Sequence, residues 1–191
     1  MEKLILASTS PRRKRILEQV GFQFQVIASD FEENMTINKK PKELVKYFSF
    51  KKAEAVVKKL KKGIVIGADT IVVCLGEIMG KPKGEKDAKR MLKKISGRKI
   101  SVITGFTIWD VETNKKITRA VESSLYIKRL TDQEISNYIE TKEPLDKAGA
   151  FSVQGKGALI VKKTEGDYQT IVGLPIYDIA QELKSFGIKI F

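Results

Sequence analysis

Three segments of this chain place polar side chains where a predicted strand meets a turn, which is where α/β sheets usually build their sites. The first segment is Ser8-Thr9-Ser10-Pro11-Arg12-Arg13, at the start of a predicted helix. Hydroxyls and free backbone N–H groups at a helix start attract anions, and two arginines add donors suited to phosphate oxygens. The segment therefore predicts a phosphate-binding site, with an N-capped helix bearing solvent-exposed arginines as the alternative.

The second segment, Gly67-Ala68-Asp69-Thr70, puts a carboxylate inside the otherwise apolar run IVIGADTIVV. Because burying an unpaired carboxylate is costly, Asp69 must be capped, salt-bridged or bound to a cation. The small residues Gly67 and Ala68 would let a ligand approach the backbone closely. We predict a functional role for Asp69, and a purely structural cap is the alternative.

The third segment, residues 146–157, combines glycines and other small residues with a lysine, an aspartate and Gln154. This composition is typical of a binding loop, although a tight connection between elements would share it. Lys81, in front of Pro82, is a further candidate for reaching a phosphate, with an ordinary turn as the alternative. Together these residue types favour phosphoryl chemistry, in which cations hold the phosphates and a carboxylate holds a metal ion or activates water.

Two absences narrow the chemistry further. The sequence has no histidine and a single cysteine, Cys74, which excludes Ser-His-Asp and Cys-His triads and the usual zinc sites. Cys74 lies in the apolar run IVVCL, as a buried strand residue would. No GxxxxGK[ST] loop occurs, which excludes a P-loop nucleotidase. Catalysis would have to come from carboxylates, lysines, arginines, hydroxyls and a hard metal ion.

The chain is strongly basic, with a formal net charge of +13 from 36 Lys+Arg against 23 Asp+Glu. Such an excess favours polyanionic partners, namely nucleic acid, phosphorylated small molecules or an anionic membrane surface. The alternative is that most of the lysines only solvate the surface. The N-terminal residues lack the layout of a signal peptide, and no apolar run approaches ~20 residues. We therefore expect a cytoplasmic protein with no membrane partner.

The elements that must position these segments alternate between strands and helices. Apolar alternation predicts strands over 3–7, 24–28, 64–75 with an interruption at 67–70, 100–109, 117–127 and 158–163. Helical periodicity predicts helices over about 11–20, 41–63, 85–95, 131–141 and 175–187. The alternation indicates an α/β protein, but the paired strands at 100–127 argue against a purely parallel sheet. We predict a mixed, twisted sheet flanked by helices, in one domain over residues 1–191.

The motifs LASTSPRR, GADTIV, the KP turn, ISGR, EPLDKAGAFSVQGKGA and IVGLP resemble the Maf family, in that order and at its spacing, over essentially the whole chain. The resemblance implies an enzyme that cuts a nucleoside triphosphate to the monophosphate and pyrophosphate with a divalent cation, Mg2+ or Mn2+. It also implies two lobes around a cleft, in a fold similar to that of inosine-triphosphate pyrophosphatases. GADTIV and DKAGAF..QG resemble the branch that accepts dTTP and UTP.

The resemblance also implies roles for individual residues. Asp69 matches the proton acceptor, and Arg12, Thr70 and Gln154 match positions linked to substrate choice. Glu33 matches a carboxylate at the cleft, which with Asp69 would hold the metal. The polar, phosphate-facing set corresponds to Ser8, Ser10, Arg13, Lys52 and Lys81. One departure is Gly80, where relatives often carry Glu before Lys-Pro, so the charge around the metal would differ here.

Two alternatives to a dTTP/UTP pyrophosphatase stay open. The first is a basic nucleic-acid-binding regulator of cell division, which fits the charge and the family's original description as septum-formation inhibitors. The sequence offers no recognition-helix motif for it, and its aromatic residues, at 8%, are scattered. The second is a pyrophosphatase of the same fold acting on purine or 7-methyl-GTP substrates. We expect a nucleoside triphosphate as partner and no specific nucleic acid, with a homodimer left open.

Overall fold

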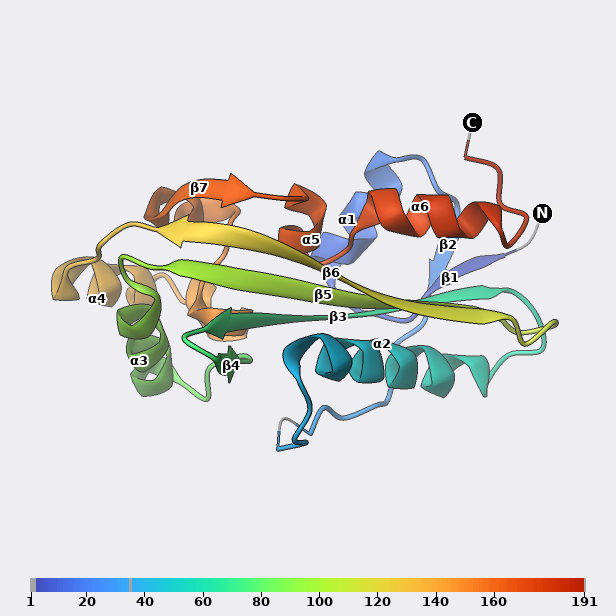
Figure 1. Ribbon diagram of the computed structural model, residues 1–191, viewed down its shortest axis with the longest axis horizontal. Helices are drawn as coiled ribbons and strands as arrows, with labels where there is room; N and C mark the ends of the chain where they lie inside the picture. The colour runs from blue at the N-terminus through green and yellow to red at the C-terminus, as the bar shows by residue number, and fades with distance from the viewer. Residues whose placement is uncertain (1–2, 35, 191) are drawn as a thin grey trace. The chain divides into compact units, whose positions relative to one another are not determined.

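The computed structural model describes residues 3–34 and 36–190, which form a β-sheet with helices around it (Figure 1). The strands are β1 (Leu4–Leu6), β2 (Phe24–Val26), β3 (Ile64–Cys74), β4 (Glu77–Met79), β5 (Lys99–Asp110), β6 (Lys116–Ile127) and β7 (Val161–Glu165). The α-helices are α1 (Pro11–Gln19), α2 (Pro41–Val57), α3 (Glu85–Ile95), α4 (Asp132–Glu140), α5 (Tyr168–Val172) and α6 (Ile176–Lys184). Three short 3-10 helices follow α4, namely η1 (Glu143–Asp146), η2 (Ala148–Ala150) and η3 (Gly155–Ile160).

All the described strands belong to one mixed sheet, in the order β2-β1-β3-β5-β6-β7, with β4 paired to β3. Strand β1 lies parallel to both β2 and β3, with Leu4 opposite Phe24 on one side and Ile64 on the other. The pairs β3–β4 and β6–β7 are antiparallel. The prediction of a mixed α/β sheet flanked by helices is therefore confirmed.

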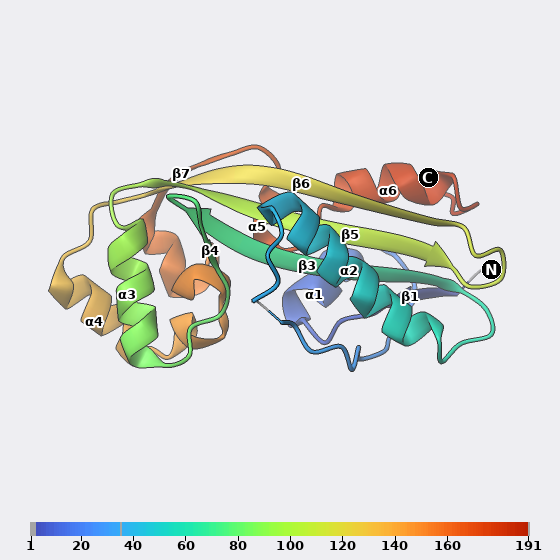
Figure 2. The ribbon, with the colours of Figure 1, turned by 60° about the horizontal axis from the view of Figure 1, so that its bottom comes forward.

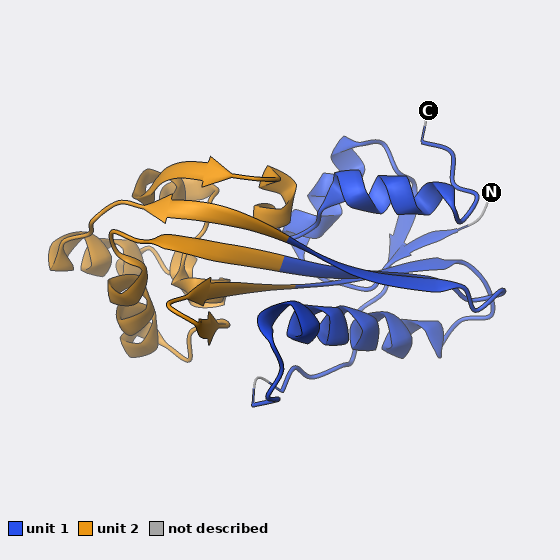
Figure 3. Ribbon diagram, viewed as in Figure 1, with its two compact units in different colours: residues 1–69, 104–121, 173–191 blue, residues 70–103, 122–172 orange. Residues whose placement is uncertain are grey.

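The chain divides into two compact units (Figure 3). Unit 1 consists of residues 1–69, 104–121 and 173–191, and unit 2 of residues 70–103 and 122–172. The chain passes from unit 1 to unit 2 between Asp69 and Thr70, within β3. Each unit has a hydrophobic core of its own. Among the described residues, no helix is both long and apolar enough to cross a membrane.

In unit 1, helix α2 packs closely against the sheet (Figure 2). A Cβ on Gly67 of β3 would lie 2.4 Å from the carbonyl oxygen of Ser49, and one on Gly105 of β5 would lie 2.4 Å from that of Val45. Neither position has room for a side chain, because the backbone of α2 occupies it. We expected a ligand to approach the backbone at Gly67, and that prediction was wrong: the close neighbour is α2.

In unit 2, helices α3 and α4 pack against each other beside the 3-10 helices. The apolar positions of α3, at Ala88, Met91, Leu92 and Ile95, join one buried cluster with residues of β5, β6 and α4. Thr131 and Glu134 form the predicted capping box at the start of α4, with each side chain accepting from the other residue's backbone N–H. The sequence-based helix at 85–95 is confirmed residue for residue.

Four local predictions differ from the structure. The strand expected over 158–163 begins only at Val161, as β7, because residues 158–160 belong to the 3-10 helix η3. Helix α2 ends at Val57 rather than near residue 63, because the N–H groups of Lys59 and Leu60 bond to carbonyls three residues back and close a turn. Strand β3 runs without interruption through residues 67–70. The expected turn after it contains the short strand β4, which pairs with the end of β3.

Candidate active site

The candidate active site in unit 1 is centred on a lysine held between two carboxylates. Lys52 Nζ donates to Asp69 Oδ1 at 2.6 Å and to Glu33 Oε1 at 2.5 Å. The side chains of Asp69 and Lys52 are 4% and 11% exposed, whereas that of Glu33 is 42% exposed. This group of three side chains therefore extends from the protein interior at Asp69 towards solvent at Glu33.

Helical spacing explains why a lysine enters the interior. Lys52 lies on the buried side of α2, four residues after Phe48 and four before Val56, both of which are fully buried. Close packing at Gly67 brings this side of α2 against β3, two residues before Asp69. We expected the lysines of this helix mostly to decorate its solvent face, and Lys52 is the exception that the structure identifies.

A buried arginine completes the group of charges. Arg13, in the first turn of α1, donates from Nε to the carbonyl oxygen of Gly173 at 2.8 Å and from Nη1 to Ser8 Oγ at 3.3 Å. Ser8 Oγ also accepts the N–H of Ser10 at 3.2 Å. Ser10 occupies the N-cap position of α1, but its side chain makes no capping hydrogen bond. Ser8, Ser10 and Arg13 thus form one hydrogen-bonded group at the start of the helix.

The charges in this group shift one another's ionisation. Burial raises the pKa of Asp69, an effect that Lys52 and Arg13 oppose and Glu33 reinforces. Burial would also raise the pKa of Glu33, but the charge and hydrogen bond of Lys52 outweigh it, and the net shift is downward. Burial lowers the pKa of Arg13, against the attraction of both carboxylates. The pKa shifts of the two carboxyl groups therefore run in opposite directions, upward for Asp69 and downward for Glu33.

The second oxygen of Asp69 bears on whether a metal ion fits here. Asp69 Oδ2 is buried and has no hydrogen-bond partner among the described residues. Such an oxygen normally finds a donor or a cation, since leaving it unpaired is costly. No group of three or more potential metal ligands of the Asp, Glu, Cys or His type occurs in the described parts of the chain. Mg2+ and Mn2+ often use only one or two protein carboxylates together with phosphate oxygens and water, and Asp69 Oδ2 is an oxygen of the type that they bind.

The other predicted site residues occupy different positions. Arg12 is half-buried beside Arg13 in α1. Thr70 follows Asp69 in β3 and is half-buried, Lys81 is exposed before the buried Pro82, and Gln154 is half-buried before η3. The structure thus groups Ser8, Ser10, Arg12, Arg13, Glu33, Lys52 and Asp69 in unit 1, and it assigns Thr70, Lys81 and Gln154 to unit 2.

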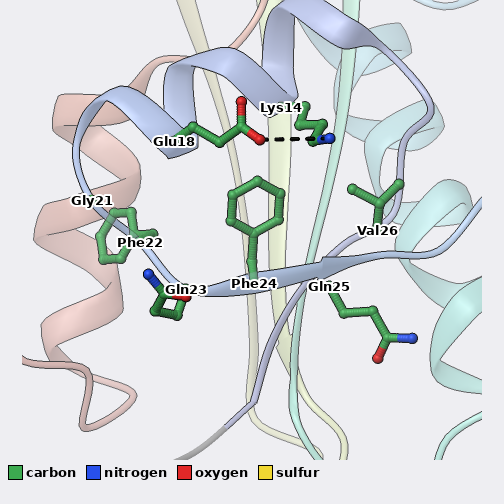
Figure 4. Close-up of a pocket in the computed structure, with 8 residues that line it drawn as sticks. All are labelled: Lys14, Glu18, Gly21, Phe22, Gln23, Phe24, Gln25 and Val26. Carbon is green, nitrogen blue, oxygen red and sulfur yellow. Dashed lines mark ion pairs between the residues drawn. The ribbon is translucent and has the colours of Figure 1, made fainter.

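A pocket of about 520 Å³ lies elsewhere in unit 1, along β2 and the turn after α1 (Figure 4). None of the predicted site residues lines it. Its charged residues, Lys14 and Glu18, form an ion pair with each other at 3.6 Å, and Phe24 lies below them.

The fold and the site together define an α/β protein with a buried carboxylate, lysine and arginine set that is suited to phosphorylated ligands. Residues 3–186 match the family model for Maf-like proteins. The chain is 45% identical to the dTTP/UTP pyrophosphatase of Methanosarcina barkeri, covering 100% of this chain and 98% of that protein. It is 47% identical to the dTTP/UTP pyrophosphatase of Geotalea uraniireducens, covering 96% and 95%. The chain belongs to the Maf family.

Among solved structures, the Staphylococcus aureus Ham1 protein is similar with a TM-score of 0.47 and 16% identity, covering 66% of this chain and 72% of that one.

Proposed function

We propose that this protein hydrolyses dTTP and UTP to the monophosphate and pyrophosphate. The observation that carries the proposal is the buried Asp69, whose Oδ2 has no hydrogen-bond partner among the described residues while its Oδ1 pairs with Lys52. Relatives named dTTP/UTP pyrophosphatase that align over nearly their full length support the choice of substrate.

In the proposed reaction, the cationic side chains neutralise the triphosphate and the hydroxyls hold its oxygens. These groups are Arg12, Arg13, Lys52, Lys81, Ser8 and Ser10. A water molecule forms a bond to the α-phosphorus, the bond between that phosphorus and the bridging oxygen breaks, and pyrophosphate leaves. Asp69 accepts the proton of the attacking water.

A divalent cation, Mg2+ or Mn2+, would be held by Asp69 and Glu33. When bound, it would polarise the phosphate oxygens and offset their charge. The downward shift in the pKa of Glu33 keeps that carboxylate ionised and available as a ligand.

Base choice is assigned to Thr70 and Gln154, together with Arg12. A neutral hydroxyl and a neutral amide complement the carbonyl and N–H edge of a pyrimidine. An acidic side chain would better match the paired N–H donors of guanine, because an ionised carboxylate only accepts hydrogen bonds.

The family model spans both units, which supports one Maf-like domain over residues 1–191. We propose a cytoplasmic location, where nucleoside triphosphates are made and used. A homodimer is compatible with this function but is not required by it.

Product analysis tests the proposed reaction directly. The protein is incubated with dTTP and MgCl2, and the products are followed by phosphorus NMR. We expect dTMP and pyrophosphate in equal amounts, and no reaction in excess EDTA. Stepwise release of orthophosphate by a preparation free of other phosphatases would refute the proposal.

A further inference from the structure

We infer that Glu143 and Tyr138 hold the loop that carries Gln154 in one conformation and thereby set the selectivity between pyrimidine and purine triphosphates. The inference rests on the proposed function, in which Gln154 takes part in base choice. Every residue concerned belongs to unit 2.

The carboxylate of Glu143 binds the backbone on the far side of Gln154. Its Oε1 accepts the N–H of Gly157 at 2.8 Å, and its Oε2 accepts the N–H of Lys156 at 3.0 Å. Oε1 also accepts the hydroxyl of Tyr138 at 2.9 Å. Both carboxylate oxygens are therefore used, and they fix two successive peptide groups after Gln154.

Tyr138 binds the backbone on the near side of Gln154. Its hydroxyl oxygen accepts the N–H of Ser152 at 3.2 Å, and the N–H of Gln154 itself bonds to Ser152 Oγ at 3.1 Å. The Tyr138 hydroxyl thus links Ser152 to Glu143, so a single chain of hydrogen bonds spans the loop. The backbone of Gln154 is held from both sides.

Two glycines show how closely the loop sits on this pair. A Cβ on Gly157 would lie 2.4 Å from the Tyr138 hydroxyl and 2.3 Å from the carbonyl oxygen of Ser152. A Cβ on Gly155, whose φ is +65°, would lie 2.6 Å from Glu143 Oε2. Neither site accepts a side chain without moving the acceptors, so the loop and the Glu143–Tyr138 pair fit each other in one arrangement.

The ionisation states suit these roles. Burial would raise the pKa of Glu143, but the two backbone N–H groups and the Tyr138 hydroxyl outweigh it and lower the pKa. Burial and the hydrogen bond to Glu143 raise the pKa of Tyr138 far above its ordinary value. An ionised acceptor and a protonated donor are therefore maintained at neutral pH. Nothing in the arrangement requires either side chain to touch substrate, so both are positioning residues.

A backbone hydrogen bond links the turn that carries Lys81 to the segment before the Gln154 loop. The N–H of Gly149 donates to the carbonyl oxygen of Gly80 at 3.0 Å, directly before Lys81. Helix η1 also contacts both η2 and η3. The motif EPLDKAGAFSVQGKGA thus contains both the loop with Gln154 and the Glu143 carboxylate that shapes it.

The test compares Glu143→Gln and Tyr138→Phe with the matched control Glu140→Gln, which removes a charge from an exposed position of α4. Glu143→Gln turns one acceptor into a donor that faces a backbone N–H, and Tyr138→Phe removes the linking hydroxyl but keeps the ring. We measure kcat and KM of pyrophosphate release for dTTP, UTP and GTP. The ratio of kcat/KM for dTTP over GTP should fall roughly fivefold or more in both variants, and stay within about twofold of wild type in the control.

A double-mutant comparison separates positioning from general destabilisation. In a Gln154→Ala background, Glu143→Gln and Tyr138→Phe should cause no further fall in the dTTP/GTP ratio, because both act through Gln154. A further fall of the same size, or an unchanged ratio in the single variants, would overturn the inference while the proposed function stands. If Glu143→Gln fails to fold, the inference is tested with Tyr138→Phe alone and with Tyr138→Phe in the Gln154→Ala background. A wild-type protein that releases no pyrophosphate from any nucleoside triphosphate would overturn both.

Discussion

Lys52 and Asp69 form a buried ion pair, 2.6 Å between Nζ and Oδ1, in which the second carboxylate oxygen of Asp69 is left without a partner among the described residues. A pair that served stability alone would be expected to satisfy both oxygens. The same lysine also binds Glu33, so two acidic groups of different burial share one cation. This arrangement leaves Asp69 Oδ2 able to accept a proton or a cation. It also predicts how substitutions at these residues change the free energy of unfolding and the metal requirement.

Replacing Asp69 by Asn should change how the free energy of unfolding depends on pH. The folded-state pKa of Asp69 is raised above the ordinary 3.8, so ionising it costs stability above the folded-state pKa and costs nothing below 3.8. The stability of Asp69→Asn relative to wild type should therefore increase as the pH rises from below 4, and level off above the folded-state pKa. Urea unfolding at several pH values, followed by the fluorescence of Trp109, the single tryptophan, gives the measurement. A relative stability of the variant that stays constant or falls as the pH rises would contradict the direction of the shift.

Replacing Lys52 by Met should destabilise the fold strongly. The change leaves a buried carboxylate without its cation, and breaking a buried pair in this way typically costs about 3–5 kcal/mol. Lys51→Met is the matched control, because Lys51 pairs with Glu54 in a more exposed position. The loss in the control should be about 1 kcal/mol or less. Equal and small losses of unfolding free energy in the two variants would show that the Lys52 pair is not a buried one.

Replacing Glu33 by Gln should raise the Mg2+ concentration needed for half-maximal activity roughly tenfold, equivalent to about 1.4 kcal/mol of binding free energy. The neutral amide keeps an oxygen but loses the charge that attracts the cation. Glu32→Gln removes a charge from the exposed neighbouring residue and should leave the Mg2+ requirement unchanged. We would measure pyrophosphate release over a titration of MgCl2 after EDTA treatment. The same shift in both variants would assign it to the overall charge of the segment.

The net charge of +13 makes DNA binding a separate question. We expect DNA affinity to be weak, independent of sequence and steeply reduced by salt, because surface lysines bind phosphates without reading bases. Fluorescence anisotropy with several labelled duplexes at two salt concentrations would measure it. Nanomolar, sequence-selective binding at physiological salt would instead favour a nucleic-acid-binding regulator.

Local signals in the sequence predicted much of the fold. The helix at 85–95 and the Thr131–Glu134 capping box depend on residues three or four apart, and both are confirmed. The buried charge at Asp69 was predicted to need a partner, which the structure identifies as Lys52. The spacing of Lys52 on the apolar side of its helix was the available signal for that pair.

Contacts between distant parts of the chain could not be predicted in the same way. The close packing of α2 on Gly67 depends on residues far apart in sequence, so the sequence alone suggested a ligand rather than a helix as the close neighbour of that glycine. Glu143 was missed as a loop-positioning residue because its partners, Lys156 and Gly157, lie more than ten residues away. The glycines of the 155–157 segment indicated a special loop but not the carboxylate that shapes it.

The most direct test of the central claim is a pyrophosphate-release assay on wild type and Asp69→Asn across a panel of dTTP, UTP, CTP, ATP, GTP, ITP and 7-methyl-GTP with Mg2+. We expect wild type to hydrolyse dTTP and UTP at least roughly tenfold faster than GTP or ATP, as a buried polar mismatch of about 1–3 kcal/mol would produce. In Asp69→Asn the rate of dTTP hydrolysis should fall roughly 10³-fold, which corresponds to about 4 kcal/mol of transition-state stabilisation. Near wild-type turnover of dTTP by Asp69→Asn would contradict the assigned role of Asp69, and 7-methyl-GTP or ITP as the best substrate would contradict the pyrimidine assignment.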